Sequence, residues 1–301
     1  MGRSDRMVQA RKVLIVLMGG LVLLALAFIW HRSLPVCSAL SDRLASIYPA
    51  EDGSVVPCPW EIGDRPLMIL VLGQSNAGNH GATPAHDTSP ALFFYQGRCY
   101  LTAGPAPGAT GKGGNIWTYL SPLLSTELQR PVVFSVLAVD ATSITEWTAE
   151  SALRELVVKT IRQGKAHGFI PELVLWQQGE ADARSGMSGA EYRQKLDKLR
   201  ASIRNELERG AMIVAQSTRC RNEGSEDIRR VLGEAAEGRS GVILGPDTDA
   251  LQGDFRLDGC HFSLSGLKAA SSLWASVIVS ALVAPGERGH PLSASKPVGA
   301  I

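Results

Sequence analysis

The sequence has almost no net charge, no metal-binding cysteine or histidine spacing, and no internal repeat. Its 30 Lys and Arg residues nearly balance 29 Asp and Glu residues, giving a formal charge of +1, so we expect no nucleic-acid partner. Neither Cys-x-x-Cys nor His-x-x-x-His occurs, so we expect no metal or other cofactor. An apolar fraction of 45% in 301 residues is typical of a globular protein with one large core.

A long apolar run lies near the N-terminus, at residues 13–30. About 18 residues without a charge can cross a bilayer. Basic residues precede the run, which favours a cytoplasmic N-terminus and a C-terminal domain outside the cytoplasm, periplasmic in a Gram-negative cell. A cleaved signal peptide, releasing a secreted protein, is the alternative, because residues 25–27 read Ala-Leu-Ala. Since apolar residues 28–30 follow that site, we favour a single-pass membrane anchor.

Composition divides the chain into four segments. We expect a basic flank and transmembrane anchor at residues 1–32 and a juxtamembrane stalk at 33–65, where prolines recur without periodicity. The main domain would span residues 66–284. Residues 285–301 are rich in Pro, Gly and Ser, which is typical of a flexible tail.

Apolar runs and helical periodicities alternate along the main domain. This alternation predicts an α/β fold, a three-layer α/β/α sandwich around a mostly parallel sheet. The Gly- and Pro-rich residues 79–114 are expected to form a long loop with one short apolar piece at 91–95. The expected strands are 67–72, 132–139, 173–177, 211–215 and 242–244, and the expected helices are 116–128, 149–167, 189–208, 226–237 and 265–283.

Ser75 is the candidate nucleophile. It follows the unbroken apolar run 67–72, which is typical of a strand buried on both faces. Ligands of open α/β sheets bind at the carboxyl ends of such strands. The alternative is that Ser75 only caps a helix or forms a turn.

Asp258 and His261 are the candidate partners of Ser75. In an Asp-x-x-His turn, the carboxylate can accept the Nδ1 proton of the imidazole and leave Nε2 to take a proton from serine. An ordinary surface loop is the alternative interpretation of this short pattern. His80 and His86, in the expected long loop, are the rival candidates for the base.

An ester hydrolase also needs hydrogen-bond donors for the developing oxyanion. The candidates are the backbone N–H of Ser75, a backbone N–H of the turn that contains Gly114 and Asn115, and the side-chain amide of Gln178. For the glycine-containing turn, an ordinary loop bend is the alternative.

The sequence contains five cysteines, which agrees with an oxidising compartment and leaves one unpaired. Cys220 and Cys260 both lie in loops expected at the active edge of the sheet, so they are the first candidate pair. Cys37 and Cys58 flank the expected stalk and are the second. Sequence alone leaves the connectivity open.

Three motifs, Gly73–Asn76, Trp176–Asp182 and Asp258–His261, resemble in order and spacing the sialate O-acetylesterase domain branch of the SGNH hydrolases. Residues 142–147 also look like that branch. The resemblance implies a flavodoxin-like sheet and ester hydrolysis without a metal, by Ser75, His261 and Asp258.

The same resemblance assigns Gln178 and the turn at 113–115 to the oxyanion hole. It gives Gln74, Asn76, Glu180 and Asp182 supporting roles, although Glu180 could instead contact a sugar hydroxyl. The motif at Trp176–Asp182 has Gln-Gly-Glu where the wider superfamily has Gly-x-Asn-Asp, which makes Gln178 the side-chain donor.

These inferences predict a membrane-anchored, outward-facing serine esterase that removes O-acetyl groups from a sialate, a surface polysaccharide or another acetylated glycan. An O-acetyltransferase with the same triad is one alternative, and a non-catalytic glycan-binding or envelope-assembly module is another. Trp117, Trp147 and Trp176 could stack on sugar rings or pack in the core.

Overall fold

The computed structural model describes residues 40–49, 54–85, 88–207, 210–221, 223–237 and 241–283. The chain separates into two units, Met1–Ser46 and Ile47–Ile301. In the first unit, residues 40–45 are helical. The expected membrane anchor at 1–32 and the expected tail at 285–301 lie outside the described residues.

An eight-stranded sheet forms the centre of the second unit, in the order β1-β4-β3-β5-β2-β6-β7-β8. The strands from β3 to β8 in this order run parallel. At the β3 side, β4 pairs antiparallel with β3, and β1 pairs antiparallel with β4. The mostly parallel sheet is therefore confirmed. The strands are β1 (Val55–Val56), β2 (Leu67–Gly73), β3 (Ala91–Tyr95), β4 (Arg98–Thr102), β5 (Val132–Ala138), β6 (Leu173–Gln177), β7 (Ala211–Gln216) and β8 (Val242–Asp247).

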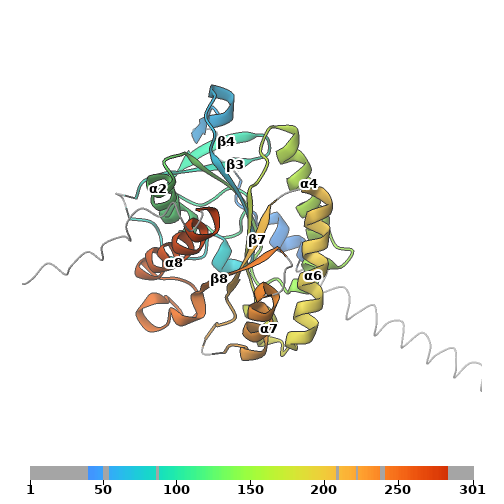
Figure 1. Ribbon diagram of the computed structural model, residues 1–301. Helices are drawn as coiled ribbons and strands as arrows, with labels where there is room; N and C mark the ends of the chain where they lie inside the picture. The colour runs from blue at the N-terminus through green and yellow to red at the C-terminus, as the bar shows by residue number, and fades with distance from the viewer. Residues whose placement is uncertain are drawn as a thin grey trace, which may run out of the picture. The chain divides into compact units, whose positions relative to one another are not determined.

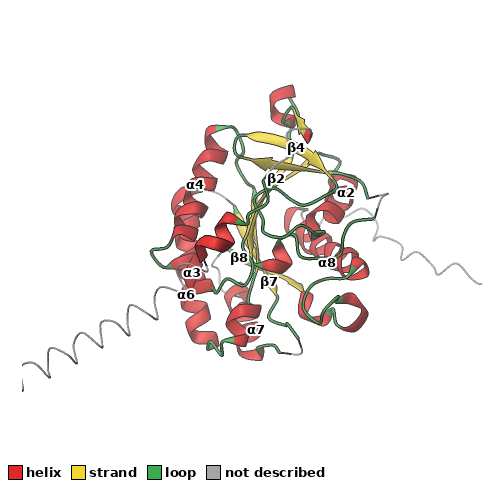
Figure 2. Ribbon diagram, turned by 180° about the vertical axis from the view of Figure 1, so that it is seen from behind, coloured by secondary structure: helices red, strands yellow, loops and turns green. Residues whose placement is uncertain are grey.

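Helices cover both faces of this sheet, which makes three layers (Figure 1). One face carries α2 (Ile116–Leu128) and α8 (Leu264–Leu282), and these two helices pack against each other. Figure 2 shows the other helical layer from behind. That layer consists of α3 (Ile144–Thr148), α4 (Ala152–Ala166), α6 (Gly189–Glu206) and α7 (Glu226–Glu237).

Strand β2 lies between β5 and β6, the neighbours that its apolar sequence requires. Six of its seven residues are buried, because helices cover both faces of the sheet. After β2, the chain forms β3 and β5 on one side of that strand and then crosses to form β6 on its other side. The end of β2 is thus the switch point at which α/β sheets form ligand sites.

Helix α8 is, within the described residues, long and apolar enough to cross a membrane. Leu267, Trp274 and Ile278 on this helix are buried in the main hydrophobic core, however, next to α2. This packing explains its apolar composition as that of a core helix.

Residues 79–114 are not the single long loop expected from the sequence. They contain a hairpin of β3 and β4, and β1 from the expected stalk pairs with β4 through Val56 and Cys99. This pairing brings Cys58 to Cys99, and the two form a disulfide. The expected Cys37–Cys58 pair is therefore wrong, because sheet pairing selects a different partner for Cys58.

Candidate active site

Ser75 lies where β2 ends and begins a short 3-10 turn, Ser75–Ala77. Gly73 precedes it with a φ of 156°, and a Cβ there would lie 2.1 Å from the carbonyl oxygen of Gln177. Glycine therefore lets the end of β2 lie directly against the end of β6. Ser75 is 6% exposed, so its side chain is held at the edge of the packed core.

Asp258 and His261 form the pair expected from their spacing. The Nδ1 atom of His261 lies 2.9 Å from Oδ2 of Asp258. Burial raises the pKa of Asp258, but hydrogen bonds from the backbone N–H and side chain of His261 and the backbone N–H of Cys260 outweigh it and lower the pKa to about 2. Asp258 is thus an ionised acceptor that fixes the imidazole with Nε2 available.

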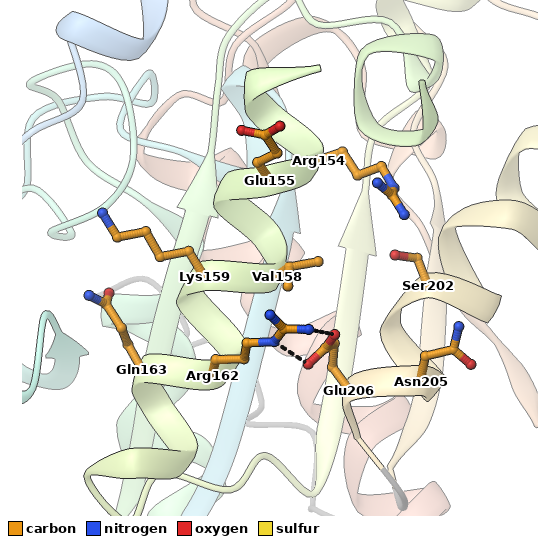
Figure 3. Close-up of a pocket in the computed structure, with 9 residues that line it drawn as sticks. All are labelled: Arg154, Glu155, Val158, Lys159, Arg162, Gln163, Ser202, Asn205 and Glu206. Carbon is orange, nitrogen blue, oxygen red and sulfur yellow. Dashed lines mark hydrogen bonds and ion pairs between the residues drawn. The ribbon is translucent and has the colours of Figure 1, made fainter. Parts of the chain in front are cut away.

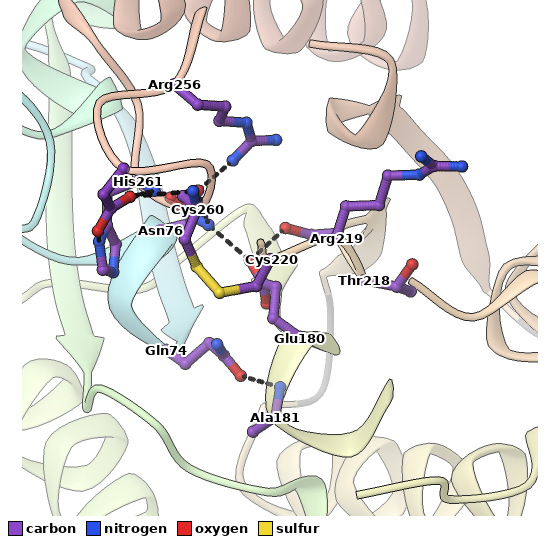
Figure 4. Close-up of a disulfide and its surroundings, with 12 residues drawn as sticks. Gln74, Asn76, Glu180, Ala181, Thr218, Arg219, Cys220, Arg256, Cys260 and His261 are labelled. Carbon is purple, nitrogen blue, oxygen red and sulfur yellow. Dashed lines mark hydrogen bonds and ion pairs between the residues drawn. A yellow bond between two sulfur atoms is a disulfide. The ribbon is translucent and has the colours of Figure 1, made fainter. Parts of the chain in front are cut away.

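The loop that carries His261 is fastened to its surroundings by a disulfide and an arginine (Figure 4). Cys260 is bonded to Cys220, as expected. Arg256 is buried and donates to the carbonyl oxygens of Leu251, Thr248 and Cys260, at 2.7, 2.6 and 2.6 Å respectively. The disulfide and these three hydrogen bonds thereby fix the position of the loop that carries His261.

The Ser75 turn and the His261 loop contact each other through their neighbouring residues. The side-chain amide of Asn76 donates to the carbonyl oxygen of Cys260 at 3.2 Å, and Ala82 donates its N–H to Phe262 at 2.9 Å. Within the described residues no hydrogen bond joins the side chains of Ser75 and His261 directly. Such contacts commonly tighten only when substrate is bound.

The family model of carbohydrate esterases described as sialic acid-specific acetylesterases matches residues 115–276. The chain belongs to this family. Its members hydrolyse ester bonds of carbohydrates, so the chain is a carbohydrate O-acetylesterase by family. The match includes Asp258, His261 and the Gln178 motif, and it begins after Ser75.

Solved structures agree with the fold of this esterase family. A protein from Arabidopsis thaliana is similar over 72% of this chain and 99% of its own, with 19% identity and a TM-score of 0.59. The structure of NanS is similar over 72% and 97%, with 13% identity and a TM-score of 0.50. No curated protein matches the sequence. At these identities, the likeness to solved structures establishes the fold.

In this esterase, Gln178 does not provide the expected oxyanion donor. Its side chain is fully buried, and its amide donates to the carbonyl oxygen of Thr142 at 2.8 Å and to the Asp182 carboxylate and Gln74. Since protein acceptors take both amide protons, Gln178 holds the ends of β5 and β6 together. Asp182 also accepts the N–H of Ile144, and burial raises its pKa.

The turn at 113–115 is also directed into the protein. The N–H of Gly114 donates to the carbonyl oxygens of Gly81 and Ala82. Asn115 caps α2, accepting the N–H of Thr118 at 3.0 Å. The Gln178 amide, the Gly114 N–H and the Asn115 side chain are therefore corrected to structural roles. For the Ser75 N–H, the described residues supply no acceptor.

Glu180 is buried beside Asn76, the residue that follows the candidate nucleophile (Figure 4). Its Oε1 atom accepts from Asn76 at 2.7 Å and from Ser217 at 2.9 Å. Burial raises its pKa to about 7, against the effect of those hydrogen bonds. With 2% exposure, Glu180 supports the Ser75 turn through its hydrogen bond with Asn76 and is not placed to contact a sugar hydroxyl.

Of the rival histidines, His80 lies in this site and His86 lies outside the described residues. The Nε2 atom of His80 is 3.1 Å from the hydroxyl of Thr110, and its ring stacks on His261. Because Asp258 hydrogen-bonds to the His261 ring, His261 is the better-oriented base.

Sequence reasoning missed Arg256, Ser217 and Thr110. Arg256 had a usable signal, since an arginine two residues before an Asp-x-x-His motif is close to its loop carbonyls. Ser217 and Thr110 had none, because their partners come from distant segments. Trp117, Trp147 and Trp176 are fully buried, so they are core residues rather than sugar-stacking platforms.

A separate groove between α4 and α6 is lined mainly by charged and polar side chains (Figure 3). Arg162 and Glu206 form an ion pair across it at 2.8 Å. None of the residues that line this groove belongs to the candidate triad. The described residues contain no cluster of side chains suited to a metal ion.

Proposed function

We propose that this protein is a serine esterase that removes O-acetyl groups from a glycan through an acyl-enzyme. The observation that carries the proposal is the Asp258–His261 pair, which the Asn76–Cys260 hydrogen bond connects to the Ser75 turn. Membership in a carbohydrate esterase family supplies the substrate class. Asp258 orients the base, His261 transfers protons, and Ser75 attacks.

In the first half of the reaction, Nε2 of His261 takes the hydroxyl proton of Ser75 as Oγ bonds to the acetyl carbonyl carbon. The Ser75 N–H donates to the oxyanion. Collapse of the tetrahedral intermediate breaks the bond to the sugar oxygen, which leaves with the proton from His261. Acetyl-Ser75 remains.

In the second half, His261 takes a proton from water as the water oxygen attacks acetyl-Ser75. The serine–acyl bond then breaks, the proton returns to Oγ, and acetate leaves. The ionised Asp258 stabilises the imidazolium formed in both halves.

We also propose that the domain, which includes β1 and Cys58 of the expected stalk, works outside the cytoplasm, joined through the preceding residues to an anchor at 1–32. The two disulfides support an oxidising compartment, where such bonds persist. The basic residues before the apolar run support a cytoplasmic N-terminus.

The test is acetate release by the detergent-solubilised full-length protein from O-acetylated sialic acid and O-acetylated polysaccharides. We expect release without an added acceptor and its loss in Ser75→Ala, while Ser202→Ala on α6 retains it. Full activity of Ser75→Ala would reject the serine mechanism. Acetyl transfer to an added glycan without free acetate would instead identify an acetyltransferase.

A further inference from the structure

His80 lies directly beside the proposed base. The centroids of the His80 and His261 rings are 5.4 Å apart, and the ring planes differ by 27°, so the rings are stacked. Asp258 holds one edge of the His261 ring through Nδ1. A single hydrogen bond leaves the ring free to tilt about it, and a stacked neighbour restricts that motion.

Thr110 fixes the ring of His80. The buried Thr110 hydroxyl oxygen accepts the backbone N–H of Asp140 at 2.9 Å and lies 3.1 Å from Nε2 of His80. Among the described residues, the acceptor for the hydroxyl proton of Thr110 is Nε2 of His80. This arrangement favours a neutral His80 that accepts at Nε2 and carries its proton on Nδ1.

The charges around His80 come from three segments. Burial, the largest influence, lowers its pKa, Asp140 after β5 raises it, and His261 lowers it again, while Asp258 in the His261 loop raises it. The net direction is downward, so His80 is neutral at neutral pH.

We propose that His80 is a positioning residue that acts on His261 and must be neutral for full activity. Its ring keeps the His261 plane aligned between Asp258 and Ser75. When Ser75 gives its proton to His261, the resulting imidazolium rests against the face of an uncharged aromatic ring. A protonated His80 would place a second positive charge against it. This inference rests on the proposed serine mechanism.

The pH profile of kcat/KM distinguishes this role from simple packing. Because His261 must accept a proton and His80 must be uncharged, on the acid side the wild-type profile should fall more steeply than uptake of one proton allows. In His80→Phe, a stacked ring remains that cannot be charged. We expect its acid side to show the slope for one proton, with a plateau lowered by about threefold.

Companion variants separate the stacking from the charge. His80→Ala loses the stacked ring, so its plateau kcat should fall by about tenfold, more than in His80→Phe. Thr110→Val removes the hydroxyl that holds His80 and should lower kcat, whereas Thr110→Ser should restore it. His167→Phe, at the end of α4, is the matched control and should match the wild type in slope and plateau.

The measurements use the full-length protein with 4-nitrophenyl acetate from about pH 5 to about pH 8. Wild-type slopes in both His80→Phe and His80→Ala, with unchanged plateaus, would overturn the role of His80. Thermal unfolding of each variant identifies losses caused by misfolding, and Thr110→Val tests the same contact if a His80 variant fails to fold. Activity retained by Ser75→Ala would reject the proposed function itself.

Discussion

The two halves of the candidate site are held by different means. The Ser75 half rests on the sheet, where Gln74, Gln178 and Asp182 form a buried network across the ends of β2, β5 and β6. The His261 half is an exposed loop fastened by the Cys220–Cys260 disulfide, Arg256 and Asp258. Core packing places the candidate nucleophile, and local cross-links place the candidate base.

This difference predicts that substitutions in the two halves affect stability and activity to different extents. Changes under Ser75 remove buried hydrogen bonds and should lower the free energy of unfolding. Side-chain changes in the His261 loop that leave its disulfide intact affect a half-exposed segment, so they should lower activity more than stability. The following variants test the separation, from the largest expected effect to the smallest.

Asp258→Asn should have the largest effect on activity. Its amide cannot replace the ionised acceptor at Nδ1 of His261, so we expect kcat to fall roughly 10³-fold to 10⁴-fold. The Asp258 side chain is 44% exposed, so the melting temperature should change little. Asp254→Asn, earlier in the same loop region, is the control. A kcat within tenfold of wild type would contradict the orienting role of Asp258.

The two disulfides give a matched comparison, because their sequence separations are 41 and 40 residues. Loop entropy predicts that losing either one lowers the free energy of unfolding by about 4 kcal/mol. Only Cys220→Ser/Cys260→Ser should also lower kcat, by about tenfold, because it releases the His261 loop.

Kinetics and chemical denaturation of Cys58→Ser/Cys99→Ser beside that double variant provide the measurement. Equal losses of kcat in both double variants would show that the Cys220–Cys260 bond has no special role in placing His261.

Glu180→Gln tests the buried Ser75 half of the site through the pH dependence of the free energy of unfolding. The pKa of Glu180 is about 7 in the folded protein and 4.5 without the fold, so the folded state favours the neutral form. Its stabilising contribution is present below about pH 4.5 and is lost as pH rises through about 7. Since glutamine does not ionise, the stability of the variant relative to wild type should rise by about 3 kcal/mol over that interval.

Urea denaturation at several pH values measures this difference, and Glu155→Gln on the surface of α4 is the control. A difference that stays constant with pH would show that Glu180 is ionised in the folded protein at neutral pH.

Arg162→Met should have the smallest effect. Arg162 pairs with Glu206 on the surface between α4 and α6, and exposed ion pairs contribute little. We expect kcat/KM to stay at the wild-type value and the melting temperature to move by no more than about 2 °C. A large loss of activity would link the groove in Figure 3 to the reaction.

Long buried elements could be predicted from the sequence because their pattern is local. The apolar run at 67–72 became β2, and the helices expected at 116–128 and 226–237 have the same bounds in the structure. The β3–β4 hairpin was missed because its strands are only five residues long and are surrounded by Gly, Pro and Thr.

The candidate triad and the Cys220–Cys260 pair could be proposed from sequence because motif order implies which loops meet. Hydrogen-bond partners could not. Whether Gln178 or Gly114 has a free N–H depends on carbonyl groups that folding brings from Thr142 and Gly81. The pairing of Cys58 likewise depended on β1 joining β4.

Covalent labelling with a fluorophosphonate tests the central claim most directly, because the reagent bonds to a serine that a neighbouring base activates. After labelling of the full-length protein, peptide mass spectrometry should locate the label on Ser75, and His261→Ala should abolish it. Esterase activity that survives without label on Ser75, or a label on Ser75 that is unchanged in His261→Ala, would contradict a catalytic Ser75–His261 pair.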